Sequence, residues 1–164
     1  TTPSTEERID DARSTRSLST YLAEDATSTP AFAPERPQGG FDVSTVDGPA
    51  NNDCGGPGTN IVHMQWTETI VTERTYVANY RFVVEDGSAR VRRIECSADV
   101  GDPYTVDFSR DLTPALDPSA APVASLTLNS EGEVELLTFT LTGKTGETVL
   151  VEVASRNPSE FFPS

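Results

Sequence analysis

The chain has 164 residues, of which 35% are hydrophobic and 23% are charged. This is enough apolar material for one folded domain with its own core, and it argues against wholesale disorder. Acidic residues outnumber basic ones by 26 to 12, which gives a net charge of −14 and disfavours binding to nucleic acid or to anionic membrane surfaces, because both would be repelled.

The first predicted element is a long amino-terminal helix over residues 1–28. A capping-box pattern opens it and a proline follows its end. At 100° per residue, Leu18, Tyr21 and Leu22 share one face, which predicts contact between the helix and a sheet. The residues earlier on that face are polar: Asp11, Ser14 and Thr15. The first three turns therefore have no partner within the chain, and they are either a solvated helix end or a contact with another molecule.

Sequence patterns after the helix predict strands. Residues 29–60 are rich in proline, glycine and asparagine and indicate mostly ordered loop. Alternating runs over residues 61–96 predict an antiparallel meander, with Asp86-Gly87 as a hairpin turn. Residues 104–155 predict a second β-region. We therefore predict a single α+β domain over residues 1–164, with a long amino-terminal helix packed on antiparallel sheet.

The two cysteines, Cys54 and Cys96, are 42 positions apart. The sequence has no CxxC pair and one histidine, so it lacks the ligands of a zinc site. We predict a Cys54–Cys96 disulfide that ties a glycine-rich loop to the end of a strand, with two buried thiols that never meet as the alternative. The disulfide would place the domain outside the reducing cytosol.

Motifs of catalysis are missing from the sequence. His63 lies midway along a predicted strand with no nucleophile frame such as GxSxG, so we interpret it as a surface histidine. Acidic pairs are too frequent for any one of them to indicate a glycosidase, and residues 97–107 lack the spacing of an EF-hand loop, although a calcium site stays open. We expect no enzyme activity, no catalytic residue, no cofactor and no bound metal.

Two other groups of residues are assigned to structural roles. Arg90, Arg92 and Arg93 form the densest cationic cluster, and among so many acids we interpret them as internal ion-pair partners. Trp66 and Tyr80 are candidates for a sugar platform, but they alternate in phase with aliphatic neighbours, so we predict that they pack in the core.

Several motifs over residues 8–96 follow one another in a recognisable order. An acidic L-x-x-D turn near the helix end is followed by a variable loop, a tryptophan strand, a Tyr-x-apolar strand, a polar glycine turn and an apolar-x-Arg strand. They stand at Leu22–Asp25, Trp66, Tyr80–Phe82, Asp86-Gly87 and Val91–Arg93. This order resembles the soluble head domain of a type IV pilin-like minor pilin, most closely that of the J-type minor pseudopilins.

The resemblance implies a non-catalytic structural subunit that initiates or caps a type IV pilus or a type II secretion-like fibre at the bacterial cell envelope or surface. It implies other pilin or pseudopilin subunits as partners, bound through the amino-terminal helix, and a membrane anchor that preceded Thr1 and has been removed. The helix residues that would face those subunits are Arg8, Ile9, Ala12, Arg13 and Arg16.

A second class of function is a binding module, either a cell-surface adhesin or a carbohydrate-binding domain. The long loop Phe32–Thr59 and the excursion Thr113–Pro122 suggest it, because loops held on a sheet often carry recognition. A secreted hydrolase is a third class, and it rests only on the abundance of acidic residues.

Overall fold

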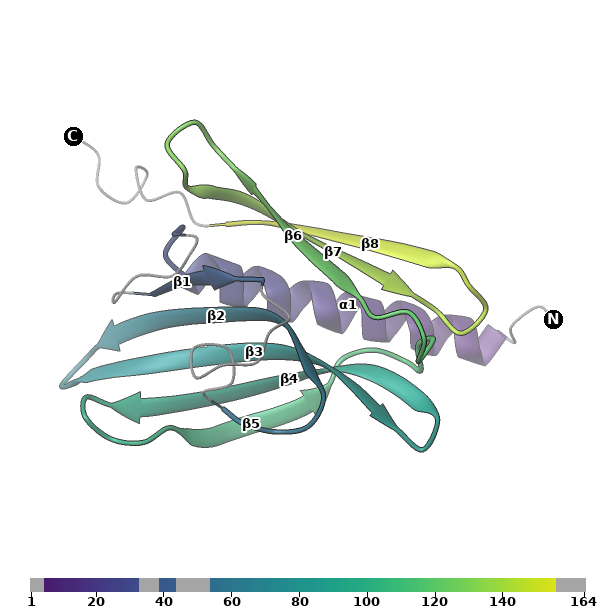
Figure 1. The fold of residues 1–164 in the computed structure, drawn as a ribbon, viewed down its shortest axis with the longest axis horizontal. Helices are drawn as coiled ribbons and strands as arrows, with labels where there is room; N and C mark the ends of the chain where they lie inside the picture. The colour runs from purple at the N-terminus through teal and green to yellow at the C-terminus, as the bar shows by residue number, and fades with distance from the viewer. Residues whose placement is uncertain (1–4, 33–38, 44–53, 156–164) are drawn as a thin grey trace.

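The computed structural model describes residues 5–32, 39–43 and 54–155, with the side chains of the helix described from Ser17 onward. These residues form one helix and eight strands. They are α1 (Thr5–Ser28), β1 (Gly39–Asp42), β2 (Thr59–Thr69), β3 (Glu73–Glu85), β4 (Ser88–Asp99), β5 (Thr105–Asp111), β6 (Val123–Leu128), β7 (Val134–Thr142) and β8 (Thr148–Ala154). All strand pairs are antiparallel, and they form a large sheet in the order β1-β2-β3-β4-β5 and a small sheet in the order β6-β7-β8 (Figure 1).

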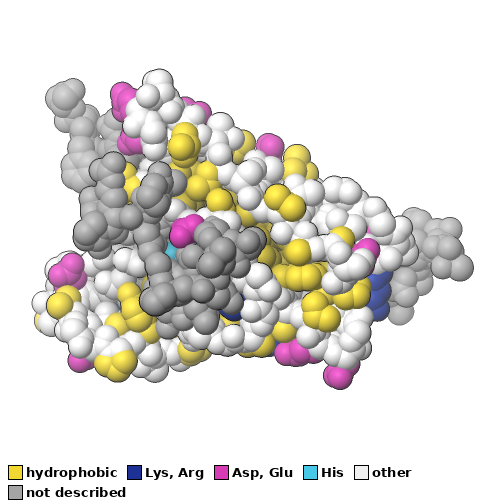
Figure 2. All heavy atoms as spheres, in the orientation of Figure 1, with side chains coloured by type: hydrophobic (Ala, Val, Ile, Leu, Met, Phe, Trp, Pro, Cys, Tyr) yellow, Lys and Arg dark blue, Asp and Glu magenta, His cyan; other side chains and the backbone are white. Residues whose placement is uncertain are grey.

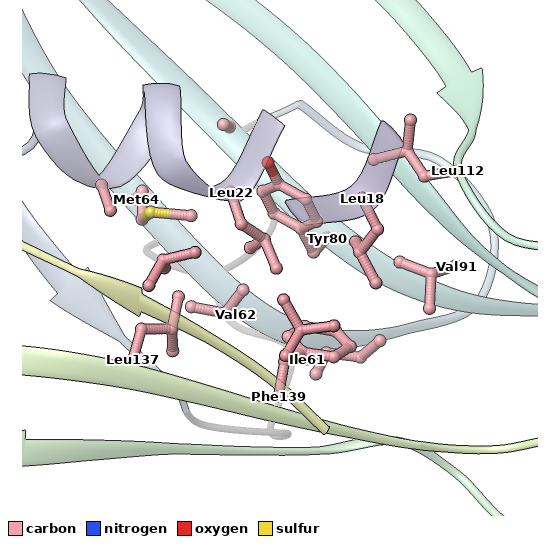
Figure 3. Close-up of a cluster of buried hydrophobic side chains, with 14 of the residues drawn as sticks. Leu18, Leu22, Ile61, Val62, Met64, Tyr80, Val91, Leu112, Leu137 and Phe139 are labelled. Carbon is pink, nitrogen blue, oxygen red and sulfur yellow. The ribbon is translucent and has the colours of Figure 1, made fainter. Parts of the chain in front are cut away.

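The hydrophobic core lies between the two sheets and beside α1. In Figure 2 the small sheet forms the upper part of the molecule and the large sheet the lower part. Tyr80 on β3 meets Phe139 on β7 with ring centroids 6.4 Å apart, and Leu18 and Leu22 of α1 belong to the same cluster (Figure 3). We call the face of the large sheet that carries Tyr80 its inner face, and the opposite face its outer face.

The hairpin between β3 and β4 shows how local sequence sets the strand register. Its turn is Asp86-Gly87, and both residues have a positive φ, at 53° and 76°. Asp-Gly is favoured in such two-residue turns because glycine adopts positive φ without a steric penalty and aspartate tolerates it. The turn pairs Glu85 with Ser88 and fixes the alternation that puts Tyr80 on the inner face.

The segment between β5 and β6 ties the two sheets together. The Leu112 N–H donates to the Val91 carbonyl at 2.8 Å, and the Leu116 N–H donates to the Ala89 carbonyl at 2.7 Å. Leu116 also forms a β-bridge to Gly143 at the end of the small sheet, and it is buried. The first part of the expected Thr113–Pro122 excursion is therefore built into the scaffold, whereas Pro118, Ser119 and Ala121 are exposed.

The predicted Cys54–Cys96 disulfide is confirmed, with Cα atoms 5.4 Å apart. It holds the segment after Cys54 against the outer face of the large sheet. Arg81 on β3 is only 1% exposed and donates from Nε to the Pro57 carbonyl at 2.9 Å and from Nη2 to the Gly58 carbonyl at 2.6 Å. A disulfide such as Cys54–Cys96 is typical of an oxidising, extracytoplasmic compartment.

The predicted fold class, a pilin-like α+β fold organised on an amino-terminal helix, is wrong, because the protein is predominantly antiparallel β. The helix contributes Leu18, Leu22 and Ala26 to the buried apolar cluster, whereas the other buried members come from the strands and their connections. The helix was the longest continuous pattern in the sequence, but most of the buried apolar side chains come from the strands and their connections. This mostly β fold gives no structural basis for a resemblance to minor pilins or J-type minor pseudopilins. Among the described residues, no helix combines the length and the hydropathy that a membrane span requires.

Candidate functional site

The helix residues of the predicted subunit interface lie outside the described side chains. They are Arg8, Ile9, Ala12, Arg13 and Arg16. Of the residues predicted to join the helix to a sheet, Leu18 and Leu22 are fully buried and Tyr21 is half-buried. The Tyr21 ring lies 6.2 Å from that of Phe108 on β5, and the Arg93 guanidinium lies 5.0 Å from the Tyr21 centroid.

A buried polar network connects α1 to the large sheet. Arg93 donates from Nε to Asp25 Oδ2 and from Nη2 to Asp25 Oδ1, both at 2.8 Å, and from Nη2 to Glu95 Oε1 at 3.0 Å. The Tyr80 hydroxyl donates to Asp25 Oδ2 at 2.5 Å. Burial, and then the Asp25 charge, raise the pKa of Tyr80 well above its usual value. Burial by itself would lower the pKa of Arg93, but the hydrogen bond to Asp25 and the Asp25 charge raise it, so Arg93 stays charged. The polar groups of Asp25, Tyr80 and Arg93 bind one another, so the network holds the helix against the large sheet.

The other two residues of the arginine cluster lie on the outer face. Arg92 donates from Nε to Asp111 at 2.7 Å and from Nη1 to Glu85 at 3.3 Å. The prediction of internal ion pairs is thus confirmed for Arg92 and Arg93, whereas Arg90 pairs with no acidic residue in the described part of the chain.

A shallow polar hollow of about 250 Å³ lies beside the turn between β3 and β4. Its lining residues are Val83, Glu85, Asp86, Ser88, Arg90, Arg92 and Asp111. Three carboxylates face two guanidiniums there, and Arg92 already binds two of the carboxylates. This composition favours neither an anion site nor a metal site. No group of three or more His, Cys, Asp or Glu residues suited to a metal occurs within residues 5–32, 39–43 and 54–155.

The prediction that His63 is a surface residue is wrong, because its side chain is fully buried. It lies on the outer face of the large sheet, with Nδ1 3.4 Å from Asn79 Nδ2. The outer face is itself covered here, since Val77 and Ile94 are at most 4% exposed. The alternation in β2 identified the correct face, but it gave no information on what covers that face. The predicted core positions of Trp66 and Tyr80 are confirmed: they are 6% and 0% exposed.

Exposed aliphatic side chains gather at the opposite end of the large sheet. Ile70 and Val71 are 87% and 91% exposed in the turn between β2 and β3, and Val100 is 72% exposed in the turn between β4 and β5. The two turns are neighbours because Arg74 and Asp99 are paired in register and form an ion pair of 2.9 Å (Figure 1). We call Ile70, Val71 and Val100 the hairpin-end surface.

A hollow of about 220 Å³ adjoins the hairpin-end surface. It is lined by Glu68, Ile70, Val71, Thr72, Arg74 and Tyr76. The Tyr76 ring is stacked on that of Trp66, with centroids 5.9 Å apart. The Arg74 guanidinium is held by Asp99 at 2.9 Å and by the Ser97 hydroxyl at 3.1 and 2.8 Å. The Asp99 hydrogen bond raises the pKa of Arg74, and the same ion pair balances the Arg74 charge at the edge of the hollow.

The composition of the β2–β3 turn does not follow from turn chemistry. Tight turns favour Gly, Asn, Asp, Pro and Ser, and Asp86-Gly87 at the other end of β3 follows this preference. Ile70 and Val71 are β-branched, disfavour turns and contribute nothing to the core. Clustered exposed aliphatic residues indicate an interaction surface. The sequence contains this signal as Thr-Ile-Val-Thr between two strands, but the predicted site residues do not include it.

No protein-family model matches this chain, and no curated protein and no solved structure matches it significantly. The resemblance to a minor pilin or J-type minor pseudopilin therefore has no support from any comparison, and the mostly β fold contradicts it. Function has to be argued from the residues of the site, because no related fold supplies an analogy.

Proposed function

We propose that this chain is a non-catalytic, extracytoplasmic domain at a cell surface, which binds a protein partner through the hairpin-end surface. The observation that carries the proposal is the exposure of Ile70, Val71 and Val100 at one end of the large sheet. Neither turn formation nor core packing requires aliphatic side chains at these positions. Removing them from water against a partner would be favourable by the hydrophobic effect.

The scaffold behind this surface supports the proposal. Ser97 receives hydrogen bonds from Arg74 and donates to Asp107 at 2.5 Å, which links β3, β4 and β5 beside the two turns. The Cys54–Cys96 bond fastens a further segment to β4. A surface that is already ordered loses less conformational entropy on binding than a flexible one.

The side chains at the hairpin end favour a protein partner over a carbohydrate. Sugar platforms use an exposed aromatic face, and the only tryptophan, Trp66, is 6% exposed and covered by Tyr76. The exposed hydrophobic side chains at the hairpin end, Ile70, Val71 and Val100, are aliphatic. A cell-surface adhesin is therefore the better form of the binding-module hypothesis, and a carbohydrate-binding domain is the outcome that would replace it.

The test uses the only lysine of the chain, Lys144, in the turn between β7 and β8. This turn lies at the end of the molecule away from the β2–β3 turn (Figure 1). With its α-amino group blocked by acetylation, the chain is labelled there with an amine-reactive dye, and its binding to cells of its source is measured by flow cytometry. We expect the double variant Ile70→Ser, Val71→Ser to bind about tenfold more weakly.

The matched control is Val123→Ser, Leu128→Ser on β6, which removes two aliphatic side chains that are 63% and 46% exposed. We expect this control to bind like the unchanged chain. Equal binding by both double variants would overturn the proposal. Binding that is abolished by glycosidase treatment of the cells, and not by protease treatment, would replace it with carbohydrate recognition.

A further inference from the structure

The hairpin-end surface is bordered by carboxylates. Glu68 on β2 and Glu73 on β3 flank the first turn, and Asp99 and Asp102 flank Val100 in the second. All four carboxylates are exposed. In Figure 2, acidic and hydrophobic atoms are visible next to each other at the left end of the large sheet. The aliphatic centre thus has an acidic border.

One basic residue, Arg74, lies within this border, and its charge is already matched. Its Nη1 donates to Asp99 Oδ1 at 2.9 Å. Glu68, Glu73 and Asp102 form no ion pair within the described part of the chain. Three of the four border carboxylates therefore have no ion-pair partner in the part of the chain that the structure describes.

We infer that the partner of the hairpin-end surface is a protein segment in which aliphatic side chains are flanked by lysine or arginine. The inference rests on the proposed function and specifies the chemistry of its partner. Aliphatic contact in the centre would supply affinity, as it does in the cores of protein interfaces. Opposite charges at the border would speed association, orient the partner and disfavour acidic competitors.

The acidic border also favours a protein partner over a membrane surface. Exposed aliphatic residues at loop tips could enter a lipid surface, but membrane-binding segments combine such residues with lysine and arginine, which attract anionic headgroups. Glu68, Glu73 and Asp102 would be repelled by those headgroups. Three aliphatic side chains also form a small contact, so we expect a weak and reversible complex.

The test uses three short synthetic peptides of equal length, in which Leu alternates with Lys, Ser alternates with Lys, and Leu alternates with Glu. The chain is immobilised through Lys144, and affinities are measured by biolayer interferometry between about 0.05 M and 0.5 M salt. We expect the Leu/Lys peptide to bind about tenfold more tightly than either of the others. The Ile70→Ser, Val71→Ser variant should bind the Leu/Lys and Ser/Lys peptides equally.

A charge-matched pair of variants separates the border from the overall negative charge. Glu68→Gln, Glu73→Gln removes two border carboxylates, and Asp86→Asn, Glu152→Gln removes two exposed carboxylates elsewhere. We expect the first variant to bind the Leu/Lys peptide several-fold more weakly and with a smaller salt dependence than the second. Equal affinities of the two variants would overturn the inference, and so would equal affinities of the unchanged chain for the Ser/Lys and Leu/Lys peptides.

Vesicles of phosphatidylserine and of phosphatidylcholine complete the test, and retention on either kind would replace the inference with membrane binding. The inference and the proposed function can fail separately. If source-cell binding depends on Ile70 and Val71 but the peptides show no preference for Leu/Lys, only the inference fails. If source-cell binding does not depend on these two residues, both fail.

Discussion

Two regions reverse the usual placement of side chains. One is the contact between α1 and β4, and the other is the hairpin-end surface. Arg93 and Asp25 are charged yet lie inside, whereas Ile70 and Val71 are aliphatic yet lie outside. The inside pair is satisfied by two hydrogen bonds of 2.8 Å, and the outside pair is at least 87% exposed. The difference indicates that the first reversal serves folding and that the second is free to serve binding.

The largest expected effect on stability comes from Asp25→Ala. The change leaves the Arg93 guanidinium buried with Glu95 as its remaining carboxylate, and it leaves the Tyr80 hydroxyl without its acceptor. Breaking one side of a buried ion pair costs about 3–5 kcal/mol. We expect a loss of that order in the free energy of unfolding, measured by urea denaturation. Glu24→Ala, at an exposed neighbour, is the control, and a loss as small as that of the control would contradict the comparison.

A smaller and pH-dependent effect is expected from Tyr80→Phe. At neutral pH the loss of the hydrogen bond to Asp25 should cost about 1–3 kcal/mol. Burial raises the pKa of Tyr80, so the folded state keeps a proton that the unfolded state releases above about pH 10. The stability that Tyr80 contributes is therefore complete below that pH and declines as the pH rises toward the raised pKa.

The difference in stability between the unchanged chain and Tyr80→Phe should accordingly shrink between about pH 8 and pH 11. Urea denaturation at both values measures it, and the other tyrosines cancel because both proteins carry them. A difference that stays constant or grows over this range would show that Tyr80 does not keep its proton in the folded state.

The smallest expected effect on stability comes from Ile70→Ser. Exposed substitutions away from caps, cavities and strained backbone usually change stability by less than about 0.5 kcal/mol. Leu22→Ala is the contrasting variant, because Leu22 is fully buried and such a truncation costs about 2–5 kcal/mol. If Ile70→Ser destabilised the fold as much as Leu22→Ala, the hairpin end would be structural and would no longer be free for binding.

Features that depend on local pattern were predictable from the sequence. The disulfide followed from two cysteines without metal-ligand spacing, and Trp66 and Tyr80 were assigned to the core because they alternate with their strand neighbours. The ion pairs of Arg92 and Arg93 followed from the excess of acidic residues, although the sequence did not identify Asp25 as a partner. That contact joins residues 68 positions apart, and no periodicity reports it.

Features that depend on what covers a face were not predictable. His63 was assigned to the surface from strand alternation. Alternation indicates on which face of the sheet a residue lies, but it does not indicate whether that face is exposed to solvent. The fold class failed for the same reason, since the two sheets bury more of the core than the helix does. The hairpin end was missed because the predicted meander implies a reversal between its first two strands but does not show that Ile70 and Val71 lie in that turn with their side chains exposed.

Leu116 pairs with Ala89 of the large sheet and with Gly143 at the end of the small one. Through this one residue the connecting segment forms β-bridges to both sheets. Cutting the chain there would not release two independently folded halves, because each sheet would lose its β-bridge to Leu116. The molecule should melt in one cooperative transition, and any attempt to transplant the hairpin end into another protein has to take both sheets along.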